Sequence, residues 1–237
     1  MLPWLVAVLA LLLLVYALSL SASFQFDDWQ VVVRDPRVQS LSAWWHSMPG
    51  MRALTKLSYA LNHEWSSRAE AFRVVNVALH ALNTALVFVF VRTMAQRLGN
   101  PPDGRATAVA VLTALVFALH PVQTESVTYI AARPNLIATL FSLASLVAWL
   151  KGRERHTNGW WSLATLCFIA ALAGKETAAV LPLAMLLCLA AEHRLSVREA
   201  AFPLGLCGLF GLLLVAVWAH FPYDYLVRTS LATRGPL

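Results

Sequence analysis

Residues 160–191 read WWSLATLCFIAALAGKETAAVLPLAMLLCLAA, and the only charges in these 32 residues are Lys175 and Glu176. A transmembrane helix needs roughly 20 predominantly apolar residues, so this stretch exceeds one crossing. It is either one long helix with an ion pair buried near its middle, or two helices joined by a tight turn at Gly174. Glycine commonly ends helices, and the charge distribution described below also favours two helices.

The same low charge extends over the whole chain. Of its 237 residues, 59% are hydrophobic and 13% are charged, and the mean hydropathy is +0.64. Soluble domains contain about a quarter charged residues, so this composition excludes a disordered chain and most soluble enzymes. The net charge of +6 comes from basic residues that stand singly, with no basic block for a nucleic acid. The sequence predicts an all-α integral membrane protein, with the lipid bilayer and no nucleic acid as a partner.

Reading from charge to charge gives seven uncharged runs. They predict a single multi-span membrane domain over 1–237, with an extracytoplasmic loop at 23–70. About seven transmembrane helices are expected, at about 2–22, 72–92, 105–120, 134–151, 159–174, 177–191 and 200–221. With the turn at Gly174, eight basic residues share one side, which the positive-inside rule makes cytoplasmic together with the N-terminus. These eight are Arg92, Arg97, Arg105, Lys151, Arg153, Arg155, Arg194 and Arg198.

The first run has an alternative interpretation as a signal peptide, because Ser21-Ala22-Ser23 resembles a cleavage site. There is no basic segment before it, and the apolar stretch from Leu2 to Leu20 is longer than a signal peptide needs. We therefore interpret it as a retained first transmembrane helix.

The loop at 23–70 is too aromatic for a linker. Two sets of apolar residues recur in it at helical spacing, namely Leu41, Trp44, Trp45 and Met48, and then Leu54, Leu57 and Leu61. Short amphipathic helices of this kind lie flat at the membrane interface. The alternative is an ordinary extracytoplasmic loop that folds over the helix bundle.

Ionisable groups at membrane depth are costly, so each is a candidate functional residue. Asp27 and Asp28 directly follow the first predicted helix, between Phe26 and Trp29. A carboxylate among apolar neighbours can serve as a general base toward a hydroxyl, or it can bind a divalent metal. Because successive residues point in different directions, we expect only one to face a given cavity. The alternative is that the two acids simply end a helix at the water boundary.

Two further clusters fall on the predicted outer side. His120, Glu125 and Arg133 could bind an anionic headgroup or position an acceptor, or they could form a network that caps helices and stabilises the loop. Lys175 could neutralise a phosphate at membrane depth, or it could form a polar hairpin tip with Glu176.

A fourth polar cluster lies within the predicted helix at 72–92. Arg73, Asn76, His80 and Asn83 share one face of it. Such residues commonly form hydrogen bonds between membrane helices. The alternative is that they line a substrate cavity.

Several short segments together carry a resemblance to a known family. They are Phe26-Asp27-Asp28-Trp29, Arg52-Ala53-Leu54, Tyr59-Ala60-Leu61-Asn62, VNVALHALN at 75–83, HPVQTESVTYI at 120–130 with Arg133 just beyond, and Gly174-Lys175-Glu176-Thr177. In this order, over about residues 25–185, they resemble the N-terminal membrane part of the transmembrane and TPR-containing O-mannosyltransferases of the GT-C glycosyltransferase superfamily.

The resemblance implies a GT-C-like membrane fold and a glycosyltransferase. It implies transfer of a mannose-like sugar from a polyprenyl-phosphate carrier to an acceptor hydroxyl, on a protein Ser or Thr or on a glycan, at the extracytoplasmic face. Asp27 or Asp28 would be the catalytic base. Donor and substrate binding would fall to Arg133, Lys175, Glu176, Glu125, His120, Arg52 and His80. The family favours an acid where this chain has Asn135, so a second-carboxylate role is lost there.

Cofactors stay unknown at this point, a divalent metal being one possibility. We expect no TPR domain in this chain, and a bacterial cell membrane rather than the endoplasmic reticulum. Two rival functions remain open. One is a multi-span transporter or lipid carrier, and the other is a non-catalytic, truncated paralogue that acts as a membrane scaffold.

Overall fold

The computed structural model describes residues 2–47, 52–99 and 101–220, and these residues form helices and connecting segments without a strand. The long helices of the N-terminal part are α1 (Leu2–Ala17), α4 (Ala69–Gly99), α5 (Asp103–Leu119), α7 (Arg133–Arg155) and α8 (Asn158–Gly174). The shorter elements are η1 (Trp29–Val33), η2 (Pro36–Val38), α2 (Leu41–His46), α3 (Ala53–Trp65), α6 (Gln123–Thr128), η3 (Ile130–Ala132) and η4 (Glu176–Val180). Two helices follow, α9 (Leu181–Ala191) and α10 (Val197–His220).

The all-helical membrane class predicted from the sequence is confirmed. Three helical segments in the described part are long and apolar enough to cross a bilayer, namely Ala69–Gly99, Ile130–Arg155 and Val197–Val217. Three shorter apolar helices accompany them at Leu2–Ala17, Asn158–Gly174 and Glu176–Ala191. The number of seven spans stays a prediction. The predicted helix at 72–92 is longer in the structure, and the one at 2–22 is shorter. Met48 and residue 221 lie outside the described residues.

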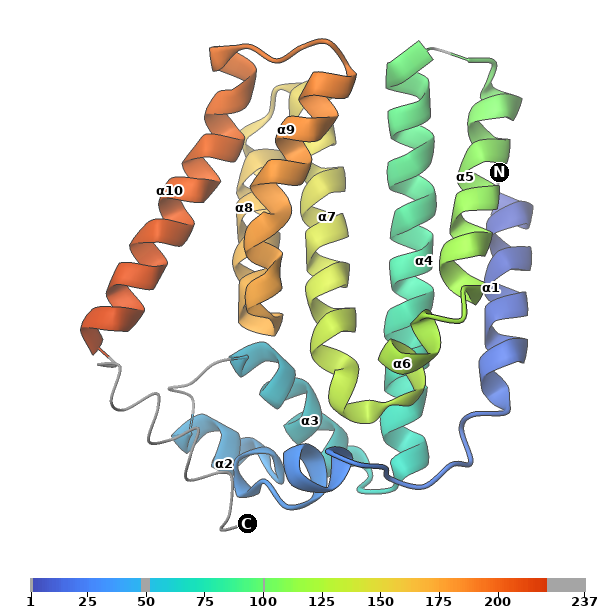
Figure 1. Ribbon diagram of the computed structural model, residues 1–237, viewed down its shortest axis with the longest axis vertical. Helices are drawn as coiled ribbons and strands as arrows, with labels where there is room; N and C mark the ends of the chain where they lie inside the picture. The colour runs from blue at the N-terminus through green and yellow to red at the C-terminus, as the bar shows by residue number, and fades with distance from the viewer. Residues whose placement is uncertain (1, 48–51, 100, 221–237) are drawn as a thin grey trace. The chain divides into compact units, whose positions relative to one another are not determined.

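The chain divides into two compact units, residues 1–181 and residues 182–237. In the first unit, α4 packs against α5 and α7, and α7 packs against α8 (Figure 1). The second unit contains most of α9 together with α10, which has Pro203 inside it. All the candidate site residues fall in the first unit.

A stripe of alanines holds α5 against its neighbours. Ala106, Ala110, Ala114 and Ala118 recur at every fourth residue and are fully buried. The last three share a core with Leu12 of α1 and with apolar residues of α4. Small side chains let membrane helices approach closely, because van der Waals contact rather than the hydrophobic effect holds them together in lipid.

Residues 160–191 form two helices rather than one. α8 ends at Gly174, and the backbone of Lys175 is extended, with φ −158°. Gly174 does not adopt a left-handed conformation. Its role is steric, because a Cβ there would lie 2.8 Å from Ile137 Cγ2 and 3.2 Å from the Ala138 nitrogen. The glycine therefore lets the end of α8 pack directly on α7.

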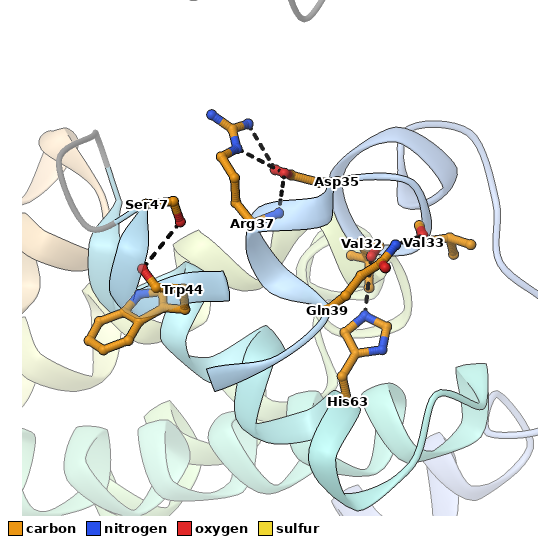
Figure 2. Close-up of polar contacts among 8 residues, drawn as sticks. All are labelled: Val32, Val33, Asp35, Arg37, Gln39, Trp44, Ser47 and His63. Carbon is orange, nitrogen blue, oxygen red and sulfur yellow. Dashed lines mark hydrogen bonds and ion pairs between the residues drawn. The ribbon is translucent and has the colours of Figure 1, made fainter. Parts of the chain in front are cut away.

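The segment between α1 and α4 is folded upon itself. Figure 2 shows Asp35 accepting hydrogen bonds from the backbone and the guanidinium of Arg37, and the Gln39 side chain donating to the Val33 carbonyl. His63 of α3 lies 3.1 Å from the Val32 carbonyl and so joins α3 to η1. α2 buries none of its residues, and Trp45 is exposed. This segment can therefore present aromatic surface while holding α3 in place.

Candidate functional site

α3 joins two turns that are far apart in the sequence. The Thr55 hydroxyl donates to the Gly174 carbonyl at 2.9 Å, and the Tyr59 hydroxyl donates to the Ile130 carbonyl at 2.8 Å. Both side chains are buried, together with Asn62, on the face of α3 that meets the bundle. α3, α6 and the lower ends of α4 and α7 lie at the same end of the first unit (Figure 1). α3 thus fixes the segment around residue 130 relative to the end of α8.

Arg133 is fully buried beside α3. Its guanidinium lies over the rings of Tyr59 and Phe72, 4.7 and 5.3 Å from their centroids. Its nitrogens donate to Asn76 Oδ1 (2.7 Å), Phe72 O (2.9 Å), Asn62 Oδ1 (3.0 Å) and Ser58 O (3.2 Å). Since all three nitrogens bind protein acceptors, Arg133 holds α3, α4 and α7 together. The donor-phosphate role expected for it stays a prediction that this geometry does not favour.

Asp28 is also fully buried and also binds the backbone. Its carboxylate accepts hydrogen bonds from the amide of Ala131 at 2.7 Å and from the amide of Gln25 at 3.0 Å. Burial raises the pKa of Asp28, and these two hydrogen bonds partly offset the rise. The side chain joins the segment after α1 to η3. We call Asp28, Arg133, Asn62 and Asn76 the buried junction.

Asp27, in contrast, is exposed. Its backbone amide donates to the Tyr129 hydroxyl at 3.1 Å, which sets Asp27 beside Tyr129. The preceding Phe26 has a positive φ of 43° and is 83% exposed, and its ring meets Tyr129 edge-on at 6.4 Å. A positive φ is costly for an aromatic residue and often marks a functional site. The two acids therefore have different environments, as expected for neighbours in sequence.

Two basic side chains lie where α3 meets the end of α8. Lys175 Nζ donates to Asn135 Oδ1 at 2.5 Å. Arg52 forms a two-point ion pair with Glu176, at 2.7 and 3.2 Å. The Arg52 hydrogen bond lowers the pKa of Glu176, so the carboxylate stays charged. All four are at least partly exposed. We call Asp27, Tyr129, Arg52, Asn135, Lys175 and Glu176 the open rim.

Three residues expected in the site, His120, Glu125 and His80, make no contact with the open rim in the described part of the chain. His120 Nδ1 accepts the Val122 amide at 3.2 Å and so shapes its own loop. Glu125 is exposed in the first turn of α6 and, within the described residues, makes no side-chain hydrogen bond or ion pair. His80 is fully buried, with Nε2 3.0 Å from the Ala118 carbonyl of α5.

The polar stripe of α4 bonds to neighbouring segments. Asn76 donates to the Val127 carbonyl at 3.2 Å and Asn83 to the Leu136 carbonyl at 3.0 Å. Arg73 donates to the carbonyls of Thr128, Ala22 and Ser23. The stripe therefore forms hydrogen bonds between helices, which is the first of the two alternatives considered from the sequence, rather than lining a substrate cavity.

Sequence reasoning missed Thr55, Tyr59 and Tyr129. Their signal was weak, because only the i, i+4 and i+7 spacing of Thr55, Tyr59 and Asn62 marks a polar face on α3. Among the described residues, no group of three or more His, Cys, Asp or Glu side chains could hold a metal ion. A divalent metal stays an untested possibility.

Residues 46–221, more than half of the chain, match the family model described as dolichyl-phosphate-mannose-protein mannosyltransferase. The chain belongs to this family. It is similar to human Protein O-mannosyl-transferase TMTC2, with 31% identity over 80% of this chain and 24% of the relative. It is also similar to human Protein O-mannosyl-transferase TMTC4, with 30% identity over 67% of this chain and 25% of the relative. A third relative is Drosophila melanogaster Protein O-mannosyl-transferase Tmtc1, with 29% identity over 76% of this chain and 21% of the relative.

This mannosyltransferase-family chain spans about a quarter of the length of the first of these relatives. The family match contains Asn62, Asn76 and Arg133 of the buried junction and all of the open rim except Asp27, and both Asp27 and Asp28 precede the match. No solved structure matches it. The apolar helices and the family together identify a helical membrane protein.

Proposed function

We propose that this chain is a glycosyltransferase module that transfers a mannose-like sugar from a polyprenyl-phosphate donor to a Ser or Thr hydroxyl of a protein. The family match supports the reaction class. The observation that carries the proposal is the open rim, because it has an exposed carboxylate at the end of the first unit where two basic side chains lie. These are the charges that such a transfer needs.

Asp27 is the proposed base. Its carboxylate accepts the proton of the acceptor hydroxyl while that oxygen attacks the anomeric carbon of the donor sugar. The bond between the anomeric carbon and the phosphate oxygen breaks, and the carrier phosphate leaves with the electron pair. Asp28 has a different task, because both its oxygens already accept backbone hydrogen bonds.

Lys175 and Arg52 are the proposed partners of the donor phosphate. The leaving phosphate gains negative charge, and preorganised cations stabilise that charge in a site of low dielectric. Lys175 is oriented by Asn135, whose amide oxygen accepts a hydrogen bond but brings no negative charge. Because this partner is neutral, the positive charge of Lys175 stays available. The carboxylate of Glu176 fixes Arg52 instead.

The extracytoplasmic face is part of the proposal, because the positive-inside rule assigns the basic residues at the other end of the first unit to the cytoplasm. They lie near the ends of α4 and α7 and the start of α5, namely Arg92, Arg97, Arg105, Lys151, Arg153 and Arg155. The named relatives are animal proteins, which does not favour the bacterial membrane expected from the sequence. The proposal therefore specifies the face and not the organelle. An acceptor glycan in place of a protein is less consistent with relatives named as protein mannosyltransferases.

The test is Asp27→Asn in the full chain in lipid nanodiscs, with mannosyl-phosphoryl-polyprenol and a peptide rich in Ser and Thr. Loss of a general base should lower transfer by about 10²–10⁴-fold, while retention of the labelled donor stays unchanged. Asp103→Asn is the matched control, because Asp103 pairs with Arg92 at the other end of α4 and α5. Full transfer by Asp27→Asn would overturn the mechanism. Donor retention without transfer by the unmodified chain would instead point to the non-catalytic scaffold.

A further inference from the structure

The connection between α7 and α8 gathers two cations on one aromatic ring. Lys151 Nζ lies 5.3 Å and the Arg155 guanidinium 5.8 Å from the centroid of the Trp160 ring. Lys151 and Arg155 are four residues apart in the last turns of α7, and Trp160 is in the first turn of α8. This cluster of three residues lies at the opposite end of α7 from Arg133. The rise of an α-helix over the 22 residues from Arg133 to Arg155 is about 33 Å.

The backbone of this connection is built for close packing. His156 adopts a left-handed conformation, with φ 52°, and its amide bonds to the Gly152 carbonyl at 2.9 Å, so α7 stops abruptly. A Cβ on Gly152 would lie 3.2 Å from the Trp161 ring and 3.4 Å from Trp160 Cβ. Gly152 therefore allows the first turn of α8 to press against the last turn of α7, which fixes Trp160 beside the two cations.

The two positive charges have no anionic partner within the described residues. No hydrogen bond or ion pair involves the side chain of Lys151 or Arg155 there, and their partner is the ring alone. Glu154, the acid between them, lies 4.0 Å from Arg97 instead. Like charges at i and i+4 repel each other on a helix, so a negative group between them would relieve the repulsion.

The surface next to the cluster is apolar. Leu163 and Leu166 follow Trp160 along α8 and are 43% and 63% exposed. Tryptophan and basic side chains commonly meet at the headgroup level of a bilayer, with apolar residues toward its centre. A free phosphate would use only the cations, whereas a lipid would use the cations and the leucines together.

From this juxtaposition we infer that Lys151, Arg155 and Trp160 bind the phosphate headgroup of an anionic phospholipid, whose acyl chains lie along Leu163 and Leu166 of α8. The site is at the predicted cytoplasmic end of the bundle, where anionic lipids attract basic side chains next to helix ends. It is separate from the open rim and does not depend on the proposed transfer reaction.

The experiment measures lipid retention by the full chain in nanodiscs that contain phosphatidylglycerol or phosphatidylcholine, by native mass spectrometry. The unmodified chain should prefer phosphatidylglycerol, and Lys151→Gln/Arg155→Gln should reduce that preference by about tenfold or more, because it removes both cations that contact the headgroup. Arg105→Gln/Arg198→Gln is the matched control, because it removes two exposed charges from the same predicted side. It should keep the preference.

Two additional arms separate the alternatives. The charge-conserving variant Lys151→Arg/Arg155→Lys should keep the preference, and it covers the case in which the neutral variant fails to fold. Inorganic phosphate should not displace phosphatidylglycerol. Equal loss in the control variant, an unchanged preference in the neutral variant, loss in the charge-conserving variant, or complete displacement by inorganic phosphate would each overturn the inference.

Discussion

The buried junction and the open rim contain residues from the same sequence motifs, yet their polar groups are used in opposite ways. Asp28 and Arg133 are fully buried, and their carboxylate and guanidinium are bonded to the protein itself. Asp27 is adjacent to Asp28 in the chain, and Lys175 binds Asn135, two residues after Arg133. Both Asp27 and Lys175 are nevertheless at least partly exposed. The difference indicates that one set of motif residues assembles the site and the other set is available to substrates.

The largest effect should follow from Arg133→Ala. It leaves four acceptors without their donor, three of them on buried residues, and creates a cavity, which should lower the free energy of unfolding by about 3–5 kcal/mol. Thermal unfolding in detergent measures this, with the exposed Arg34→Ala as the control. Unchanged stability combined with lost donor retention would instead make Arg133 a substrate-binding residue and erase its distinction from the rim.

Gly174→Ala should have the next largest effect, because a Cβ would overlap Ile137. Overpacking of this kind costs about 1–3 kcal/mol, and it should also displace Lys175 and weaken donor retention. Gly159→Ala on the same helix is the control, since a Cβ there meets nothing within 4 Å. If the two variants unfold at the same temperature, the close contact between α7 and α8 at Gly174 does not contribute to stability.

A smaller change is expected for Thr55→Val. It keeps the shape of the side chain but removes the hydrogen bond to the Gly174 carbonyl, at a cost of about 1 kcal/mol. Donor retention should fall as well, because α3 then no longer fixes the end of α8. Thr113→Val removes a hydroxyl that bonds only within its own helix. An equal loss in both variants would show that the connection between α3 and α8 adds nothing.

The smallest effect concerns the ion pair of the rim. The Arg52 hydrogen bond lowers the pKa of Glu176 below its ordinary value of 4.5. The pair therefore stabilises the fold fully above pH 4.5, and this contribution is lost as the pH falls through the lowered pKa. Since the Glu176 side chain is 54% exposed, the contribution should not exceed about 1 kcal/mol.

Unfolding temperatures of the unmodified chain and Glu176→Gln, measured from pH 3 to pH 7, check this sign. Their difference should be present at pH 7 and vanish in acid. Glu154→Gln, whose carboxylate lies 4.0 Å from Arg97, is the matched control and should show little difference throughout. A difference for Glu176→Gln that grows toward acid would contradict the lowered pKa.

Much of the helical framework could be predicted from the sequence, because long uncharged runs in a membrane protein have few alternatives to helices. The turn at Gly174 was also predictable from its neighbouring charges. Its steric cause was not, because the position of Ile137 next to Gly174 depends on how α7 packs against α8. The sequence pattern thus predicts where α8 ends, whereas the reason for a glycine at that end comes from the packing of α8 on α7.

The division of the motif residues was harder to predict. Adjacent acids must point in different directions, but the sequence does not tell which one meets the amides of Gln25 and Ala131. On α3, the leucines at 54, 57 and 61 give the visible pattern. The buried face carries Thr55, Tyr59 and Asn62 instead, because their partners are backbone carbonyls and a guanidinium from distant segments.

The most direct test of this comparison measures unfolding temperature and mannose transfer together for Asp27→Asn and Asp28→Ala. Asp27→Asn should keep the unfolding temperature and lose transfer, because its carboxylate acts on the acceptor. Asp28→Ala should lower the unfolding temperature, since two backbone amides lose their acceptor at a cost of about 1–3 kcal/mol. Normal transfer by Asp27→Asn, or an unfolding temperature lowered as much as in Asp28→Ala, would contradict the division between rim and junction.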